Sequence, residues 1–215
     1  MDIKEHIKRV FATRSNGIFF EIGAHWGIDT ISILNDVGDK ISRYVAFEPD
    51  PRNIGVFKKN VTHPAVTLVE MAVADKNGSC DFHLSSGRPK DVVDPAYNHT
   101  HSSSIRKPKL HLQAHPWCKF ESKITVPVTT LDTYCLHHDI KHIDFIWADM
   151  QGAECDMIRG GQHMLTNTDY VYMEHNEREL YDGAMPSDKL LALLPGKWEI
   201  VERYSHDILV HSMRT

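Results

Sequence analysis

The sequence has little of what marks secreted, membrane-spanning or nucleic-acid-binding chains. Its four cysteines are irregularly spaced with no CxxC pair, which argues against a disulfide framework or a common zinc site and favours a reducing compartment. No run approaches the roughly 20 apolar residues of a membrane helix, and the charged start is unlike a signal-peptide core. The net charge of −5 comes without a basic stripe. We therefore expect a cytoplasmic protein with neither a membrane span nor a nucleic-acid partner.

The composition nevertheless supports a globular domain. The chain has 215 residues, of which 41% are hydrophobic and 25% charged, enough for one domain with a sizeable core. It also carries 15 histidines. Four of them share a polar stretch without a carboxylate or cysteine at ligand spacing, so we predict a surface loop there rather than a metal site: His99, His101, His111 and His115.

Short apolar runs alternate with helical patterns along most of the chain. Strand-like runs occupy residues 17–23, 43–49, 66–74, 142–149 and 169–176, and residues 198–212 have a hairpin pattern. This alternation implies a parallel sheet with helices on both faces and right-handed crossovers. The sequence thus predicts an α/β fold: a doubly wound, mostly parallel, Rossmann-like sheet of seven strands with a C-terminal antiparallel hairpin.

A long excursion interrupts the pattern between the third and fourth strands. It contains two strand-like pieces, Cys80–Ser85 and Ile124–Leu131, separated by about 38 residues rich in His, Pro, Ser and Lys. A loop of this length inside a compact domain is usually functional or disordered. We predict an inserted strand pair with a substrate lid at about residues 86–123, all within one domain over residues 1–215.

The first motif lies where the first strand turns into a helix. It runs from Glu21 to Gly27 as ExGxxxG and differs from the GxGxxG of dinucleotide-binding turns. Gly23 lets the backbone pass close to a ligand, and the amino terminus of the next helix favours a carboxylate. This suits S-adenosylmethionine, a nucleoside that carries an amino acid. A tight turn that only packs a helix on a strand would have the same pattern.

Two further strand ends extend the predicted cofactor cleft. Glu48, followed by Pro49, ends the second strand 25 positions after Gly23, and a carboxylate near this spacing can accept hydrogen bonds from both ribose hydroxyls. Ala72 and Val73 are small and apolar at the end of the third strand. They either leave room for adenine or form an ordinary strand end.

The fourth and fifth strands end on residues that can move a proton. Asp149 ends the fourth strand and Glu174-His175 the fifth, at the edge where open α/β sheets bind ligands. Asp149 could take a proton, orient a nucleophile or ligate a metal, and His175 suits either a general base or a structural hydrogen bond. A metal is not predicted; the less favoured alternative is a divalent ion on Asp149, Glu174 and His175.

Together these segments resemble the FkbM family of S-adenosylmethionine-dependent methyltransferases, whose class I fold also ends in an antiparallel hairpin. The resemblance runs through FFEIGAHWGIDT, YVAFEPDPRN, EMAVAD, the serines at 102–104, VPVTTLDTY and IDFIWADMQGAECDMIRGG. It implies that Gly23 and the Ala24–His25 turn hold the methionine end of the cofactor, that Glu48 holds its ribose, and that Asp149 lies near the methyl group. Other residues of these segments are expected to complete the cofactor site: Glu21, Thr30, Pro49, Ala72, Val73 and Ser104.

The chain departs from the family pattern at three positions. Glu21 stands where the family usually has Asp, Trp147 where it has Lys, and Gln151 where it has Glu. Loss of both charges suggests a compensated pair or a changed pocket. Trp147 could form part of a sugar-stacking wall, with Glu174 also at the substrate.

The resemblance predicts an S-adenosylmethionine-dependent O-methyltransferase that releases S-adenosylhomocysteine. Its acceptor would be a hydroxyl of a sugar, a glycan or another small polar molecule, with Asp149 or His175 as the general base. Two alternatives remain open. One is a non-catalytic cofactor-binding module from a larger glycan-processing polypeptide. The other is an NAD-dependent oxidoreductase, which the missing GxGxxG and the terminal hairpin disfavour.

Overall fold

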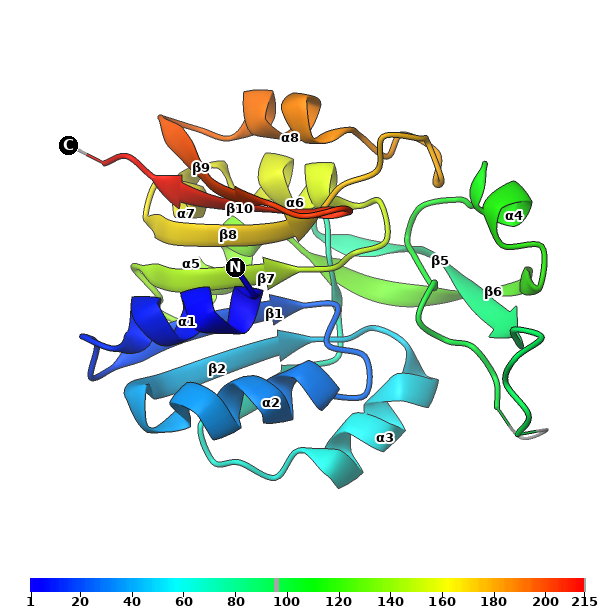
Figure 1. Ribbon diagram of the computed structural model, residues 1–215, viewed down its shortest axis with the longest axis horizontal. Coiled ribbons are helices and arrows are strands. Elements are labelled where there is room, and N and C mark those ends of the chain that lie inside the picture. The colour runs from blue at the N-terminus through cyan, green and yellow to red at the C-terminus, as the bar shows by residue number, and fades with distance from the viewer. Residues whose placement is uncertain (95–96, 215) are drawn as a thin grey trace.

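The computed structural model describes residues 1–94 and 97–214, and its main feature is a seven-stranded sheet (Figure 1). The strand order is β3-β2-β1-β7-β8-β10-β9. The first five strands are parallel, β10 is antiparallel to β8, and β9 is antiparallel to β10. The predicted sheet and its C-terminal hairpin are confirmed. The strands are β1 (Gly17–Ile22), β2 (Ile41–Phe47), β3 (Val66–Val69), β7 (Ile143–Ala148), β8 (Thr168–Glu174), β9 (Trp198–Arg203) and β10 (Asp207–Ser212).

Helices cover both faces of this sheet (Figure 1). Side chains alternate across a strand, so Phe19 packs in the core under α1, α2 and α3, and Phe20 packs in the core under α5 to α8. Burial on both faces explains why β1 is apolar nearly throughout. None of the described helices is both long and apolar enough to cross a membrane. The helices are α1 (Ile3–Phe11), α2 (Ile28–Val37), the 3-10 turn η1 (Gly38–Lys40), α3 (Pro51–Asn60), α5 (Leu131–His137), α6 (Glu154–Gly160), α7 (Gln162–Leu165) and α8 (Ser187–Leu193).

The expectation of one continuous strand over residues 66–74 was wrong. The chain leaves the main sheet after β3, and β4 (Ala72–Val73) joins a second sheet of order β4-β6-β5, with β5 (Gly78–Gly87) and β6 (Cys118–Thr129). The two residues of β4 serve different cores. Val73 packs in the core of the main sheet, whereas Ala72 packs with apolar side chains of β5 and β6. The predicted inserted strand pair is therefore present, with β4 as a third strand.

The helical stretch after β7 is divided at Gly161 into α6 and α7. A Cβ atom at Gly160 would lie 2.2 Å from the carbonyl oxygen of Ala74, so the helix passes too close to the second sheet for a side chain there. The preceding helix, α5, was not predicted. It begins at Thr130, whose hydroxyl accepts a hydrogen bond from the amide of Thr133.

The segment between β5 and β6, residues 88–117, lies on the side to which the arrowheads of β1, β2 and β7 point (Figure 1). It contains α4 (His111–Ala114). Two isolated bridges tie it to the rest of the fold, one between His83 and Ser104 and one between Pro108 and Tyr181. The predicted lid therefore stands at the carboxyl edge of the main sheet. Residues 95–96 of that lid, and residue 215, lie outside the described residues.

Candidate active site

A cavity of about 330 Å³ opens at the carboxyl ends of β1, β2 and β7. This is the edge at which open α/β sheets bind ligands. Most residues predicted for the site line the cavity: Glu21, Gly23, Ala24, His25, Glu48, Pro49, Ala72, Val73, Trp147 and Asp149. Four predicted residues do not line the cavity: Thr30, Ser104, Glu174 and His175.

The turn after β1 brings the backbones of β1 and β7 into contact. Gly23 has a φ of +96°, and a Cβ atom there would lie 1.9 Å from the carbonyl oxygen of Asp149. Gly27 then precedes α2 without a side-chain cap. The first amide of α2 to bond within the helix is that of Ile31, which donates to the carbonyl oxygen of Gly27. The amides of Ile28, Asp29 and Thr30, in the first turn of α2, precede it and have no acceptor within the helix, so they can be offered to a bound carboxylate.

Glu21 is held from behind by two hydroxyl groups. Thr30 and Tyr44 donate to its Oε2 at 2.5 and 2.6 Å, and all three side chains are buried. Burial raises the pKa of Glu21 to about 7, even though both hydrogen bonds act to lower it. Thr30, expected at the cofactor, lies behind Glu21 and orients it, so it does not form the cavity wall.

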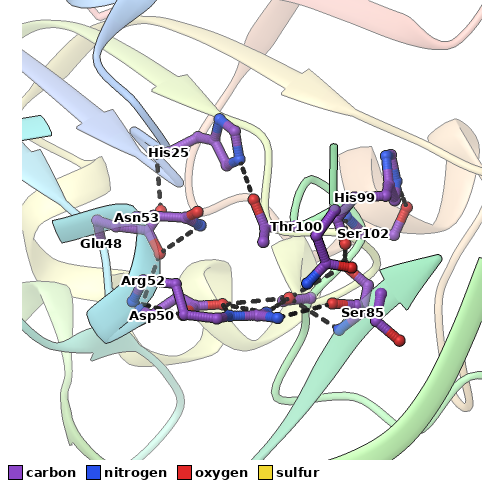
Figure 2. Close-up of polar contacts among 12 residues, drawn as sticks. His25, Glu48, Asp50, Arg52, Asn53, Ser85, His99, Thr100 and Ser102 are labelled. Carbon is purple, nitrogen blue, oxygen red and sulfur yellow. Dashed lines mark hydrogen bonds and ion pairs between the residues drawn. The ribbon is translucent and has the colours of Figure 1, made fainter. Parts of the chain in front are cut away.

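Glu48 reaches the cavity with its carboxylate already oriented (Figure 2). Its Oε2 accepts from the amide of His25 at 2.8 Å, and its Oε1 accepts from the amide of Asp50 at 2.8 Å and from Asn53 Nδ2 at 3.3 Å. Burial raises the pKa of Glu48 to about 7 despite these three donors. A carboxylate has about four acceptor positions, so capacity remains for a hydroxyl of a ligand.

The inserted segment, which connects β5 to β6, closes one side of the cavity by contacting His25. Thr100 Oγ1 lies 2.7 Å from His25 Nε2, and the His25 ring packs against those of Trp26 and His101, at centroid distances of 4.7 and 3.8 Å. Burial, followed by the neighbouring histidines, lowers the pKa of His25 to about 3, so the ring is neutral. Besides Thr100 and His101, the segment contributes Ser103 and Ile105 to the lining.

An ion pair at the start of α3 holds the same segment (Figure 2). Arg52 pairs with buried Asp50 at 2.6 Å and donates to the carbonyl oxygen of Ser85 at 3.0 Å and to the hydroxyl of Ser103 at 3.2 Å. Asp50 lies two residues after Glu48. Residues 48–52 therefore line the cavity through Glu48 and hold the inserted segment over it through Arg52. No sequence pattern indicated these contacts, because Arg52 and Ser103 are 51 positions apart.

Asp149 enters the cavity beside two other acidic side chains. Gln151 Nε2 donates to Asp149 Oδ1 at 2.7 Å and to Glu174 Oε2 at 3.0 Å, and Glu154 Oε1 accepts from the amide of Met150 at 2.8 Å. Burial raises the pKa of Glu174 and Glu154, and the charge of Asp149 adds to both shifts. Carboxyl groups perturbed in this way around a cavity are typical of active sites.

A match to a protein-family model connects this cavity to a known family. The model described as "Methyltransferase FkbM domain" matches residues 21–205, which include the glycine turn, Glu48 and Asp149. The chain belongs to the FkbM methyltransferase family. A curated relative, "2-O-methyltransferase NoeI" of Sinorhizobium fredii (strain NBRC 101917 / NGR234), is 36% identical over 192 residues, which are 89% of this chain and 76% of the relative.

A solved FkbM methyltransferase, from Methylobacillus flagellatus KT, has a similar fold. It superposes with a TM-score of 0.56 at 13% sequence identity, covering 92% of this chain and 44% of that one. This chain therefore spans less than half the length of that protein. The resemblance read from the sequence is confirmed at the level of family, fold and methyltransferase class.

In this FkbM chain the two predicted general bases differ in position. Asp149 lines the cavity, whereas His175 does not. The amide of His175 donates to the carbonyl oxygen of His206 at 2.8 Å, and its Nδ1 lies 3.4 Å from Glu177 Oε1. The structure therefore favours Asp149 over His175 as a group that can reach a bound acceptor.

The alternative metal ligands, Asp149, Glu174 and His175, are not among the described side chains whose ligand atoms converge. Within residues 1–94 and 97–214, the His, Cys, Asp and Glu side chains whose ligand atoms converge are His142, Asp144 and Asp169, with those atoms within 4.8 Å of one another. They lie where β7 and β8 begin, at the opposite edge of the sheet from Asp149. Arg14 already pairs with both of these aspartates.

The remaining predicted residues have distinct environments. Ser104 is buried, and its hydroxyl donates to the carbonyl oxygen of Gln151 at 2.9 Å, so it supports the turn after β7 and does not line the cavity. Trp147 lines the cavity and packs edge-on against Tyr172 at a centroid distance of 4.7 Å. Gln151 also lines it, so both departures from the family's charge pattern fall in the cavity wall.

Proposed function

We propose that this FkbM methyltransferase uses S-adenosylmethionine to methylate a hydroxyl of a sugar, a glycan or another small polar molecule. The observation that carries the proposal is Glu48, a buried carboxylate at the cavity wall whose orientation is set by three donors. Its remaining acceptor capacity suits a hydroxyl of a ribose. The uncapped start of α2 offers donors to the carboxylate at the other end of the same cofactor.

The charge of the cavity supports the same cofactor. Its acidic lining residues are Glu21, Asp29, Glu48 and Asp149, and the described lining includes no lysine or arginine. An acidic site favours a sulfonium cation and disfavours a pyrophosphate. This argues against the NAD-dependent oxidoreductase alternative on physical grounds, in addition to the missing glycine pattern.

We assign Asp149 as the general base that takes the proton of the acceptor hydroxyl. When bound, S-adenosylmethionine supplies a methyl group, with a C–O bond forming as the C–S bond breaks and its electron pair passes to sulfur. Asp149 accepts the proton of the acceptor hydroxyl, which makes that oxygen a better nucleophile. Glu48 and the amides of α2 hold the cofactor in place, because alignment of the reacting atoms supplies much of the rate.

The acceptor side of the cavity suits an uncharged polar molecule. Trp147 offers an aromatic surface for the C–H face of a sugar ring, and Glu174 lies one amide away from Asp149. The name of the curated relative, a 2-O-methyltransferase, supports a hydroxyl acceptor.

We assign residues 88–117 as the lid and residues 1–215 as one catalytic domain. The four cysteines are free, which fits the proposed cytoplasmic location.

Calorimetric titration tests the cofactor assignment. Wild type should bind S-adenosylmethionine with a Kd near 1 μM, about −8 kcal/mol, and Glu48→Ala should lose most of that affinity. Glu121→Ala, an exposed glutamate on β6, is the matched control and should bind as wild type does. NAD is titrated in parallel. Binding of NAD in place of S-adenosylmethionine, or equal binding by Glu48→Ala and Glu121→Ala, would overturn the assignment.

A further inference from the structure

Gln151 joins the candidate base to a second carboxyl group. Its Nε2 carries two hydrogens, and both are used, one toward Asp149 Oδ1 (2.7 Å) and one toward Glu174 Oε2 (3.0 Å). Its Oε1 lies 3.0 Å from the Tyr181 hydroxyl, whose single hydrogen is shared with the carbonyl oxygen of Ser102. The reverse orientation of the amide would turn its oxygen toward two carboxyl groups, so the surroundings settle which end is nitrogen.

The backbone at Gln151 is held in an unfavourable conformation to make this bridge. Gln151 has a φ of +53°, in the left-handed region that side chains other than glycine rarely adopt. Gly152 follows with a φ of +91°, and a Cβ atom there would lie 2.9 Å from Tyr181 Cβ. The hydroxyl of Ser104 donates to the Gln151 carbonyl oxygen at 2.9 Å. Strained residues that persist under such constraints cluster at functional sites.

The bridge also connects the inserted segment to Asp149. The buried Tyr181 hydroxyl lies 2.8 Å from the carbonyl oxygen of Ser102 and 3.0 Å from Gln151 Oε1. Ser102 and Ser104 thus support the side chain and the backbone of Gln151 from the same segment. A displacement of residues 102–104 would therefore reach Asp149 through Tyr181 and Gln151.

The surroundings of Asp149 explain why a neutral bridge matters. Burial and the charges of Asp149 and Glu154 raise the pKa of Glu174, so Glu174 carries a proton and Asp149 faces a neutral partner across the amide. A carboxylate at position 151 would place a second negative charge beside Asp149 and disturb this arrangement. The titratable groups that interact with Asp149 from the surrounding elements are Asp29, His101, Glu154, Tyr172, Glu174, Tyr181 and Asp207.

We propose that Gln151 is a positioning residue for methyl transfer. Its amide fixes Asp149 through Oδ1 and leaves Oδ2 to the acceptor hydroxyl. This role rests on the proposed function, because it presupposes that Asp149 takes the proton of the acceptor. Gln151 itself does not touch the reacting atoms.

The test compares the same isosteric change at two sites, Gln151→Glu and Gln162→Glu. Gln162 is exposed on α7, where its Nε2 donates to the carbonyl oxygens of Ile158 and Leu193. Carbon-13 carboxyl spectra, assigned with Asp149→Asn and Glu174→Gln, follow the protonation of the site without any acceptor. In Gln151→Glu the midpoints of the site signals should move up by about one pH unit or more, and in Gln162→Glu they should stay in place.

Kinetics provide the second readout, with a panel of neutral methyl pyranosides as acceptors. In Gln151→Glu, kcat at pH 7 should fall at least about 10-fold and the acid limb of its pH profile should move up, while the KM for S-adenosylmethionine changes little. Gln151→Met, which removes the donors without adding charge, should lower kcat and move the acid limb by less than Gln151→Glu does.

Three outcomes separate the possibilities. Identical titrations of Gln151→Glu and Gln162→Glu would overturn the positioning role, whatever the activity. Equal losses in kcat and in cofactor affinity, together with a lower melting temperature, would show a structural role only. If wild type methylates none of the pyranosides, the proposed acceptor class fails, and the carboxyl titration still decides whether Gln151 sets the protonation of Asp149 and Glu174.

Discussion

The two edges of the main sheet both collect acidic side chains, but they treat the charge in opposite ways. At the amino edge, Arg14 pairs with both Asp144 and Asp169, and His142 Nε2 lies 3.4 and 3.2 Å from carboxylate oxygens of the same two residues. Burial alone would raise the pKa of Asp144 and Asp169. Hydrogen bonds from His142 and the charge of Arg14 outweigh it, so both lie below their ordinary value.

At the carboxyl edge four acids, Asp149, Glu174, Glu21 and Glu48, have neutral partners. Asp149 and Glu174 share the amide of Gln151, Glu21 accepts from two hydroxyls, and Glu48 accepts from two amides and a carboxamide. Burial dominates there, and the pKa values of Glu21, Glu48 and Glu174 all lie above the ordinary value. A buried acid without a cation costs stability, and clusters of such groups mark functional sites.

The largest expected effect is a loss of catalysis from a substitution at the carboxyl edge. Asp149→Asn keeps the shape of the side chain but removes the proton acceptor, so kcat should fall by about 10²–10⁴-fold. The affinity for S-adenosylmethionine should stay within about threefold, because Glu48 and the α2 amides are untouched. Single-turnover rates and calorimetry check the two halves of this prediction. Unchanged turnover would show that Asp149 is not the general base.

The fold was predictable because its signals are local. Alternation of apolar runs and helical patterns predicted the main sheet, and the terminal hairpin followed from two runs, residues 198–204 and 207–212. The division of residues 66–74 was not visible, because Ala72 and Val73 extend an apolar run whose pairing partner, β6, lies more than 50 positions away. Nothing local separates a strand that continues from one that changes sheets.

The site was predictable where a residue stands at a strand end. Gly23, Glu48 and Asp149 follow this rule, and all three line the cavity. Contacts that depend on the inserted segment were not predictable. The Gln151–Tyr181 bond joins residues 30 positions apart, and the Ser104–Gln151 bond joins residues 47 apart. Such pairs are set by how the second sheet docks on the first, which no spacing rule encodes.

The next prediction applies one chemical change to both edges. Asp144→Asn removes an ionised partner of Arg14 and His142, and should lower the free energy of unfolding by about 2 kcal/mol, because hydrogen bonds to charged groups are the stronger class. Glu174→Gln replaces a protonated carboxyl with a neutral amide and should change the unfolding free energy by less than about 0.5 kcal/mol. Urea unfolding at pH 7 measures both. Equal costs at the two edges would mean that Glu174 is ionised.

The smallest effect is a pH dependence that belongs to the amino edge alone. Hydrogen bonds that His142 donates to Asp144 and Asp169 raise its pKa from 6.5 to about 9. A raised histidine pKa contributes stability that is complete below pH 6.5 and disappears as the pH rises through 9. The raised pKa values of Glu21 and Glu48, about 7 against an ordinary 4.5, also lower stability as pH rises, but between pH 4.5 and 7.

The two windows can be separated with His142→Ala. Because the His142 side chain is 40% exposed, its contribution should be no more than about 1 kcal/mol. Wild type and His142→Ala should differ by that amount at pH 6 and converge near pH 10, while both still lose stability between pH 4.5 and 7. His137→Ala, an exposed histidine on α5, should show no such convergence. A gap between wild type and His142→Ala that stays constant from pH 6 to 10 would show that His142 acts by packing and that its charge plays no part at this edge.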